Sequence, residues 1–466
     1  MIVQIGEVLR ATGGKLLQGE EDGLLQGVST DSRRVAPGEL FIALKGARFD
    51  GHHFALEALE RKAGGILIEE ERAGDFRWNG YRSKAVIVVK DTLKALGDLA
   101  RDRRRKYRTP VVALTGSNGK TTTKEMISAC LETTLPVLKT EANLNNLIGL
   151  PLTLLKLTEK ERAVVLEMGM NVPGEVRRLT EIAEPDVGLI TNIEKVHLEG
   201  MGSLETIKAE KGELFRRMRG DGTILVNQND PHVIDLGRGF SGRKITFGVE
   251  ESADVMAQKI EVKGMKGTSF ELIFKGRKVG VTLSLLGRHF VPNALAAIAV
   301  SDLFGIELEK VKEVLEHFRP FPMRMEVVRL EGGRSLINDA YNANPRSMEV
   351  ALETLAEVRG GGRAIAVLGD MLELGDFAEE AHRRLGEKVR ELSIDLLLTL
   401  GEHAALVVES AIRHGFEAER ARVVESHSEA VRILKGMARE GDWILVKGSR
   451  GMAMEKVVEG LIERRA

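Results

Sequence analysis

The sequence predicts an α/β protein of three domains: a small α/β unit, a central unit with a mostly parallel sheet, and a doubly wound unit. Three observations predict this fold. The 466 residues are about three times the length of a common domain. Short apolar, β-branched runs alternate with segments of helical spacing along the chain. A glycine-rich segment follows one of these runs at residue 115 and opens the next helix.

Composition restricts the class of protein. Hydrophobic residues make up 43% and charged residues 29%, and the net charge of -1 gives no global attraction to nucleic acid or to anionic membranes. The single cysteine, Cys130, excludes internal disulfides and indicates a reducing compartment. We see no signal peptide and no run of about 18 apolar residues. We therefore expect a cytoplasmic protein with no nucleic-acid partner and no membrane span, and we favour a monomer.

The first domain is expected at residues 1–90. Short apolar runs separated by turn residues and one polar loop at 45–54 indicate a small α/β module. The expected elements are a helix at 5–9, a strand at 16–17, two strands around the Pro37–Gly38 turn, and strands at 65–68 and 85–89.

The second domain is expected at residues 91–318, around the segment T-G-S-N-G-K-T-T-T-K-E at 115–125. The apolar run 111–114 precedes it, and residues at helical spacing follow. In that context G-K-T is a phosphate cradle: backbone amides face the phosphates, a lysine adds charge, and a threonine hydroxyl can reach magnesium. We therefore expect a nucleoside triphosphate here. The cofactor-binding residues are Gly116, Ser117, Asn118, Gly119, Lys120, Thr121 and Thr122.

The rest of the second domain predicts a parallel sheet extended by antiparallel hairpins. Apolar strands ending in polar residues should line a nucleotide crevice, and residues 255–286 alternate as hairpin strands do. A helix is expected at 292–304, with Pro292 in its first turn. The parallel strands are expected at 164–169, 187–192 and 223–227.

The third domain is expected at residues 319–466, after a linker that contains Pro320 and Pro322. Strand and helix signals repeat as in a doubly wound, Rossmann-like sheet. No G-x-G-x-x-G follows its first strand, so we expect no dinucleotide. The expected strands are at 335–339, 363–368, 394–398 and 443–447.

Two polar residues follow neighbouring strands of the second domain. Glu167 ends the strand after the glycine-rich loop, where a magnesium ion on a triphosphate needs an oxygen ligand. His197 follows the next strand. A solvated carboxylate and a structural histidine are the alternatives, but delivery of both to one crevice favours a second cation bridging the nucleotide to an acceptor.

Other polar residues have two interpretations. Composition makes Lys211 a surface lysine in helical charge pairs. Asn145 and Asn146 either cap a helix or order a loop around phosphate or substrate. Asn293 either caps a helix or reads an adenine edge. The basic run 101–108 is either a solvated helix end or an anion-steering patch.

The third domain offers a hinge arginine, Arg324, and a dense polar segment after its first strand, at 339–348. Strand ends are where such sheets bind ligands, and a loop that only caps the next helix is the alternative.

Together these segments resemble the Mur ligase family over the whole chain, and within it the ligases that add D-alanyl-D-alanine to UDP-N-acetylmuramoyl-tripeptide. The loop without the outer glycine, which is Leu114 here, is the form this family has. The segments that carry the resemblance are T-G-S-N-G-K-T-T, N-L-N-N-L-I-G-L-P, L-E-M-G-M, H-L-E-G-M-G-S-L-E, D-A-Y-N-A-N-P-R-S-M and G-D-M-L-E-L-G.

The resemblance implies ATP-dependent amide bond formation. The tripeptide carboxylate attacks the γ-phosphate, and the amino group of D-Ala-D-Ala attacks the acyl phosphate, giving UDP-MurNAc-pentapeptide, ADP and phosphate. It implies that Thr121, Glu167, His197 and Lys211 place magnesium, with Lys211 carbamylated. The implied catalytic residues are Lys120, Glu167, His197, Lys211 and Arg324.

The resemblance also implies binding residues in the outer domains. Arg324 and Asp339 reach ATP from the mobile third domain, and Asn293 lies near the adenine. Relatives usually have glycine before the hinge arginine, where Met323 stands here. The residues expected at the UDP-sugar are Asp31, Ser32, Arg33, Lys45, Gly46, Asp50, Gly51 and His52. Those expected near the loop or the dipeptide are Asn145, Asn146, Asn342, Asn344 and Lys447.

Two alternatives remain at this point. A folylpolyglutamate synthetase-like ligase shares the acyl-phosphate chemistry but has no UDP-sugar domain. A P-loop nucleotide switch would bind nucleotide without ligase chemistry. Three domains at one crevice also predict that ligands close it by rotation of the third domain, and that the unliganded form is open.

Overall fold

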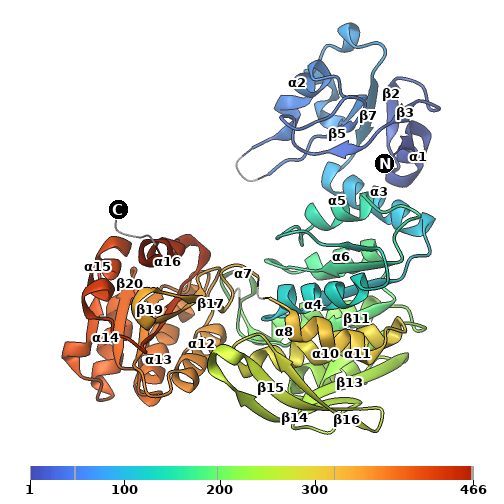
Figure 1. Cartoon of the computed structure of the whole chain (residues 1–466). Coiled ribbons are helices and arrows are strands. Elements are labelled where there is room, and N and C mark those ends of the chain that lie inside the picture. The colour runs from blue at the N-terminus through green and yellow to red at the C-terminus, as the bar shows by residue number, and fades with distance from the viewer. Residues whose placement is uncertain (1, 47–48, 197, 320, 463–466) are drawn as a thin grey trace.

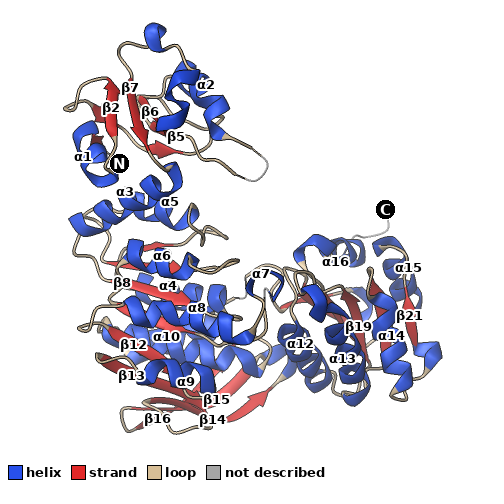
Figure 2. Ribbon diagram, turned by 180° about the vertical axis from the view of Figure 1, so that it is seen from behind, coloured by secondary structure: helices blue, strands red, loops and turns tan. Residues whose placement is uncertain are grey.

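The computed structural model describes residues 2–46, 49–196, 198–319 and 321–462. Three domains, each with its own sheet, follow one another along the chain (Figure 1). The first domain sits at the end of the central domain that carries α3 (Thr92–Lys106) and α5 (Gly149–Leu155), and the third domain lies beside the central one (Figures 1 and 2). The first and third domains stand apart in both views. None of the described helices is both long enough and apolar enough to cross a membrane.

The first domain is built on a five-stranded sheet of order β2-β7-β6-β5-β4, in which β2 alone is antiparallel to its neighbour. A two-stranded ribbon of β1 and β3 lies beside it. The strands are β1 (Val3–Gln4), β2 (Lys15–Gln18), β3 (Leu24–Leu25), β4 (Val28–Ser29), β5 (Leu40–Ile42), β6 (Gly65–Glu69) and β7 (Ala85–Val89). The helices are α1 (Ile5–Thr12), η1 (Gly51–Phe54), α2 (Ala55–Glu60), η2 (Glu70–Asp75) and η3 (Trp78–Gly80).

The central domain has a nine-stranded sheet of order β16-β15-β14-β13-β12-β11-β8-β10-β9. The strands from β9 to β14 are parallel, and β15 and β16 are antiparallel, so the predicted combination is confirmed. The strands are β8 (Val111–Thr115), β9 (Val137–Lys139), β10 (Ala163–Glu167), β11 (Val187–Ile190), β12 (Thr223–Asn227), β13 (Arg243–Val249), β14 (Val255–Val262), β15 (Thr268–Phe274) and β16 (Arg277–Leu283). The remaining helices are α4 (Lys120–Glu132), α6 (Glu175–Ala183), α7 (Leu198–Met201), α8 (Leu204–Arg217), α9 (Pro231–Arg238), η4 (Gly264–Lys266), η5 (Arg288–Phe290), α10 (Val291–Leu303) and α11 (Leu308–His317).

The third domain is a doubly wound sheet of order β17-β18-β22-β19-β20-β21, parallel except for the edge strand β17. The strands are β17 (Glu326–Arg329), β18 (Ser335–Asp339), β19 (Ala364–Gly369), β20 (Leu396–Leu400), β21 (Ala421–Val423) and β22 (Trp443–Lys447). The helices are η6 (Glu331–Gly333), α12 (Pro345–Val358), η7 (Gly375–Phe377), α13 (Ala378–Glu391), α14 (Ala404–Arg413), η8 (Ala418–Arg420), α15 (His427–Met437), η9 (Arg450–Met452) and α16 (Glu455–Ile462).

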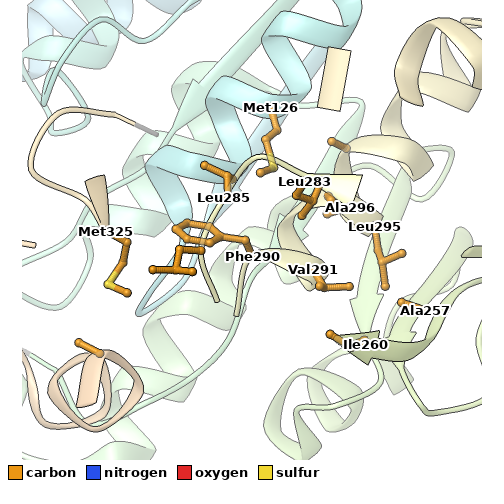
Figure 3. Close-up of a cluster of buried hydrophobic side chains, with 14 of the residues drawn as sticks. Met126, Ala257, Ile260, Leu283, Leu285, Phe290, Val291, Leu295, Ala296 and Met325 are labelled. Atoms are coloured by element: carbon orange, nitrogen blue, oxygen red, sulfur yellow. The ribbon is translucent and has the colours of Figure 1, made fainter. Parts of the chain in front are cut away.

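One hydrophobic core runs from the central domain into the third. Leu285 and Phe290 of the central domain belong to the same buried cluster as Met325 after the hinge and Met348 on α12. Figure 3 shows Phe290 close to Leu285, with Met325 beside them. Because burying apolar side chains of this size contributes about 1.5–3 kcal/mol each, this contact holds the third domain against the central one near the hinge.

The basic run at 101–108 is the paired end of α3. Arg104 donates to Asp186 and to the carbonyl of Ala183, and Arg105 pairs with Glu184. Asp186 comes directly before β11, whereas the glycine-rich loop follows the carboxyl end of β8 beside it. The run therefore lies at the opposite edge of the sheet from that loop, and the interpretation as an anion-steering patch is wrong.

Candidate active site

The glycine-rich loop joins β8 to α4 and can be built only with glycine at its two ends. Gly116 and Gly119 have φ of +149° and +80°. A Cβ on Gly116 would collide with the hydroxyl of Thr191, and one on Gly119 would lie 2.9 Å from Oδ1 of Asn293. Glycine pays no steric cost for these conformations. Asn293 therefore faces the loop from α10, whose N-cap is Phe290, so the capping interpretation of Asn293 is wrong.

The first amides of the loop are bound to the neighbouring strand end. Ser117 N–H donates to the carbonyl of Asn192, and Asn118 N–H donates to its side-chain oxygen, both at 2.9 Å. The Ser117 hydroxyl donates to the carbonyl of Glu194. Ser117 and Asn118 thus offer no amide to a phosphate in this conformation. The amides at the start of α4 keep that capacity, because a helix leaves its first N–H groups without internal partners.

Two lysines converge on one carbonyl group beneath the loop. Lys120 Nζ donates to the Gly116 oxygen at 2.7 Å, and Lys211 Nζ donates to the same oxygen at 2.9 Å. Burial lowers the pKa of Lys120, with Glu167 opposing this change. Burial, and then the charge of Lys120, lower the pKa of Lys211 well below its usual value. Lys211 is 1% exposed, so its interpretation as a surface lysine is wrong.

Glu167 ends β10 with a buried carboxylate that has one oxygen committed and one open. Asn145 Nδ2 donates to Oε1 at 2.9 Å, and the Glu167 N–H donates to the Thr140 hydroxyl. Oε2 is buried without a hydrogen-bond partner among the described residues. A buried anionic oxygen of this kind suits a hard cation. His197, predicted as its partner, lies outside the described residues.

No group of three or more His, Cys, Asp or Glu side chains is arranged as a metal site in the part of the chain that the structure describes. The two asparagines of the amide loop have different roles. Asn145 orients Glu167, whereas Asn146 accepts hydrogen bonds from Ile148 and Gly149 at the start of α5. Asn146 thus caps the start of α5, whereas a role of this loop around phosphate or substrate stays a prediction.

The hinge before the third domain is strained and carries Arg324. Met323 has φ of +60°, in the left-handed region that costs a residue other than glycine roughly 1–2 kcal/mol. This explains why glycine suits that position. The Arg324 guanidinium lies 4.2 Å from the centre of the Tyr341 ring, and its buried Nε has no partner among the described residues.

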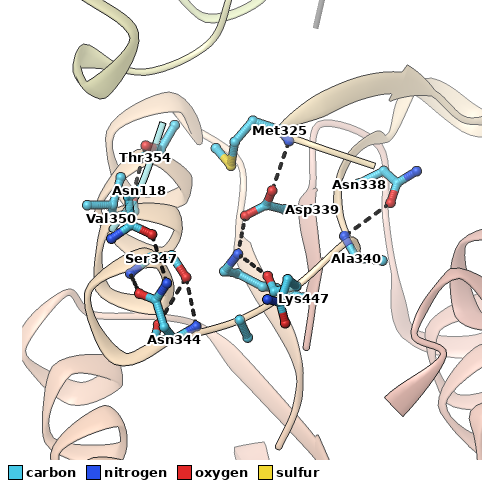
Figure 4. Close-up of polar contacts among 12 residues, drawn as sticks. Asn118, Met325, Asn338, Asp339, Ala340, Asn344, Ser347, Val350, Thr354 and Lys447 are labelled. Atoms are coloured by element: carbon cyan, nitrogen blue, oxygen red, sulfur yellow. Dashed lines mark hydrogen bonds and ion pairs between the residues drawn. The ribbon is translucent and has the colours of Figure 1, made fainter. Parts of the chain in front are cut away.

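The end of β18 and the segment after it hold an ion pair and a link to the glycine-rich loop (Figure 4). Lys447 Nζ donates to Asp339 Oδ2 at 2.5 Å and to the carbonyl of Asn342 at 3.0 Å. Asn344 caps α12 with its oxygen, while its Nδ2 donates to Asn118 Oδ1 at 2.7 Å. The third domain therefore contacts the loop directly. Its loop after β19 also contacts α7, where Glu199 N–H donates to the carbonyl of Glu373.

These residues line one cavity of about 950 Å³ between the central and third domains. No described residue of the first domain lines it. The members that the sequence predicted are Ser117, Asn118, Gly119, Lys120, Thr121, Thr122, Asn145, Asn146, Glu167, Lys211, Asn293, Arg324, Asp339, Asn342, Asn344 and Lys447.

The predicted first-domain residues lie apart from this cavity, and several hold their own loops. Asp31 accepts a bidentate hydrogen bond from Arg33. His52 is fully buried: its Nδ1 pairs with Asp50 at 2.6 Å, and its Nε2 accepts from Glu69 N–H. His52 thus cannot contact a ligand in this conformation, because its ring is buried and both ring nitrogens already have hydrogen-bond partners. In this structure two domains, not three, form the crevice.

Sequence reasoning missed Asn192 and His289. Asn192 comes two residues after the apolar strand β11, a position that could have indicated a role. Its contacts with the loop amides, however, depend on the order of the strands in the sheet. His289 lines the cavity and stacks on Phe290, with ring centres 4.1 Å apart. Its Nδ1 is buried without a partner in the described structure.

Burial lowers the pKa of His289 to about 3. Above pH 6.5 the ring is neutral in folded and unfolded chains alike. As pH falls from 6.5 towards 3, only the unfolded chain takes up the proton, so stability decreases by at most about 1.4 kcal/mol per pH unit. We expect the free energy of unfolding, measured by urea denaturation, to decrease less between pH 7 and pH 5 in His289→Gln than in wild type. Parallel losses in the two proteins would contradict this.

Comparison with known proteins places these features in a family context. The Mur ligase middle domain matches residues 114–301, the Mur ligase glutamate ligase domain matches 323–450, and the catalytic domain of the Mur ligase family matches 24–104. The UDP-N-acetylmuramoyl-tripeptide--D-alanyl-D-alanine ligase of Bacillus subtilis (strain 168) is 39% identical over 443 residues, covering 95% of this chain and 94% of the relative.

Solved structures agree. A crystal structure of MurF from Acinetobacter baumannii is similar with a TM-score of 0.90 and 32% identity, covering 100% of this chain and 99% of that one. The structure of MurF ligase from Thermotoga maritima in complex with ADP is similar with a TM-score of 0.83 and 28% identity, covering 93% and 96%.

Proposed function

The chain belongs to the Mur ligase family, and from that premise we propose that it joins D-alanyl-D-alanine to UDP-N-acetylmuramoyl-tripeptide with consumption of ATP. The products are UDP-N-acetylmuramoyl-pentapeptide, ADP and phosphate, in peptidoglycan precursor synthesis. One observation at the site supports this proposal most. Lys120, Lys211 and Glu167 of the central domain line the cavity, and strand ends of the third domain form its opposite wall.

The reaction needs positioning more than covalent help from the protein. A carboxylate oxygen of the tripeptide attacks the γ-phosphorus, ADP leaves, and an acyl phosphate forms. The dipeptide amine adds to the acyl carbon and loses a proton. The tetrahedral intermediate then expels phosphate, which keeps the oxygen that came from the tripeptide carboxylate. Lys120 and the amides at the start of α4 hold the phosphates, and Arg324 approaches them from the hinge.

The donor set fits magnesium, because Glu167 directs an unpartnered, buried oxygen and Thr121 lines the same cavity. We propose that Thr121, Glu167, His197 and Lys211, the last as a carbamate, would hold it. When bound, magnesium neutralises charge on the transferring phosphoryl group.

Lys211 suits carbamylation, in which its neutral amine adds to carbon dioxide and loses a proton, so that an ammonium group is replaced by an anion. Burial beside Lys120 lowers the pKa of Lys211 and so favours that neutral form. A carbamate would also replace repulsion between two neighbouring ammonium groups with attraction.

We propose that each domain binds one substrate: residues 1–90 bind the UDP-sugar, 91–318 bind ATP, and 319–466 bind the incoming dipeptide. The residues of the first domain that we propose to bind the UDP-sugar are Asp31, Ser32, Arg33, Lys45, Gly46, Asp50 and Gly51. We propose that the enzyme acts as a monomer in the cytoplasm, where its nucleotide-linked substrate is made.

Substrate binding should compact the molecule. The proposed UDP-sugar residues of the first domain lie outside the cavity between the central and third domains. A substrate that binds to those residues and also reaches the cavity must therefore bring the first domain towards the third. We expect small-angle X-ray scattering to show a smaller radius of gyration with UDP-MurNAc-tripeptide plus a non-hydrolysable ATP analogue. An equal radius of gyration with and without these ligands, and hence equal angles between the domains, would contradict closure.

The proposed function is tested by phosphate release from ATP, UDP-MurNAc-tripeptide and D-Ala-D-Ala, with each omitted in turn. We expect phosphate only when all three are present. Release without the dipeptide, or a preference for free glutamate, would indicate a folylpolyglutamate synthetase-like ligase. Nucleotide binding with no release under any condition would indicate a P-loop switch.

A further inference from the structure

The proposed reaction brings in a dipeptide with a free carboxylate, and that carboxylate needs a cationic partner in the cavity. Lys447 does not supply a free one. Its ammonium is 2.5 Å from Asp339 Oδ2, also donates to the carbonyl of Asn342, and its side chain is 3% exposed. A buried cation already neutralised by a carboxylate has little attraction left for a second.

Arg450 lies three residues further on and lines the same cavity with a side chain that is 57% exposed. Its N–H donates to Asn342 Oδ1 at 3.4 Å, which ties its backbone to the polar segment after β18. One guanidinium nitrogen, Nη1, pairs with Glu455 at 3.1 Å and contacts the sulfur of Met323 at 3.7 Å. The other donors, Nε and Nη2, have no hydrogen-bond partner among the described residues. They form an edge able to bind a carboxylate through two parallel hydrogen bonds.

An apolar side chain lies next to Gly451, the residue that follows this arginine. Leu372 is 43% exposed and lines the cavity, and a Cβ on Gly451 would lie 2.8 Å from its Cδ1. The loop that carries it is fixed: Leu372 N–H donates to the Ser449 hydroxyl, and Met371 N–H donates to His382 Nε2. This is the segment G-D-M-L-E-L-G, to which the sequence assigned no role.

We propose that Arg450 binds the carboxylate of the incoming D-alanyl-D-alanine and that Leu372 packs against the methyl group of its C-terminal residue. That carboxylate and that methyl group share one carbon atom, so their partners must lie close together. Leu372 lies against Gly451, the residue after Arg450, and Leu372 and Arg450 both line the cavity. The inference rests on the proposed function. It makes the two residues specificity determinants for the dipeptide, with no part in binding ATP.

The test compares D-Ala-D-Ala with its C-terminal amide as acceptors. Wild type should prefer the acid by about tenfold to hundredfold in kcat/KM, since a charge-assisted pair is lost with the amide. Arg450→Ala and Arg450→Gln should lose this preference and raise KM for D-Ala-D-Ala by a similar factor, with KM for ATP and UDP-tripeptide within about twofold of wild type. Arg432→Ala, on the exposed face of α15, is the matched control and should retain the preference.

Leu372→Ala gives a second readout. Its ratio of kcat/KM for D-Ala-D-Ala over D-Ala-Gly should fall towards one, because the methyl contact is lost. Unchanged acid preference in both Arg450 variants overturns the role of Arg450, and an unchanged ratio in Leu372→Ala overturns that of Leu372. If wild type forms no product from D-Ala-D-Ala, the proposed function itself fails.

Discussion

Glu167→Gln is expected to lower kcat by about 10²–10³-fold, the scale of losing one preorganised electrostatic partner of the transition state. The substitution keeps the shape of the side chain but removes the negative charge. It also places an amide group where the structure has a buried, unpartnered oxygen. An NH₂ there could not coordinate a cation and would have no acceptor among the described residues. The measurement is phosphate release at saturating substrates, titrated with MgCl₂.

The control for Glu167→Gln is Glu181→Gln, on the outer side of α6, where the carboxylate pairs with Arg177 one turn away. That variant should keep wild-type activity. A second readout separates chemistry from folding: Glu167→Gln should still bind a fluorescent ATP analogue, with weaker dependence on Mg²⁺. Activity of Glu167→Gln within threefold of wild type would contradict the assigned role.

Lys211→Ala is expected to be at least as damaging, with a loss of about 10³-fold in kcat. Lys211 is buried beside Lys120, and removing it takes away the proposed anionic ligand. Short carboxylates such as acetate can occupy the vacated space and should restore part of the activity. Lys208→Ala is the matched control, because Lys208 lies on the same helix and pairs with Asp235 at the surface.

The pH dependence of this effect has a defined sign. A carbamate forms from the neutral amine, and burial lowers the pKa of Lys211, so the neutral fraction is larger than for a free lysine at every pH below 10.5. Carbamylation nevertheless decreases as pH falls. Wild-type activity should therefore decline on the acid side, and added bicarbonate should oppose the decline. Lys211→Ala that no short carboxylate rescues, with a wild type indifferent to bicarbonate, would count against the carbamate.

The sheets were largely predictable because buried parallel strands read as continuous β-branched apolar runs, as Val111–Thr115 does. The missed strands lack that signal. Val137–Lys139 has three half-buried residues at a sheet edge, and Arg243–Val249 begins with two exposed basic residues. Their strand conformation depends on partners far away in the sequence, which no local pattern contains.

A site residue was predictable where its position at the end of a strand alone places it at the site. Glu167 and Asp339 end strands, and parallel strands end at one edge. Lys211 was assigned only through the family resemblance, because its helix has the composition of an exposed one and its burial arises from packing under the loop. The pairing of Asn192 with the loop amides and the full burial of His52 are likewise tertiary effects.

The proposed mechanism requires that the γ-phosphate is transferred to the tripeptide carboxylate and not to water. It is tested most directly with UDP-MurNAc-tripeptide whose reacting carboxylate carries ¹⁸O, followed by mass analysis of the phosphate released on addition of ATP and D-Ala-D-Ala. The acyl-phosphate route predicts one ¹⁸O atom in each phosphate derived from a doubly labelled carboxylate. Phosphate that carries no label, with its fourth oxygen drawn from the solvent, would contradict transfer to the carboxylate.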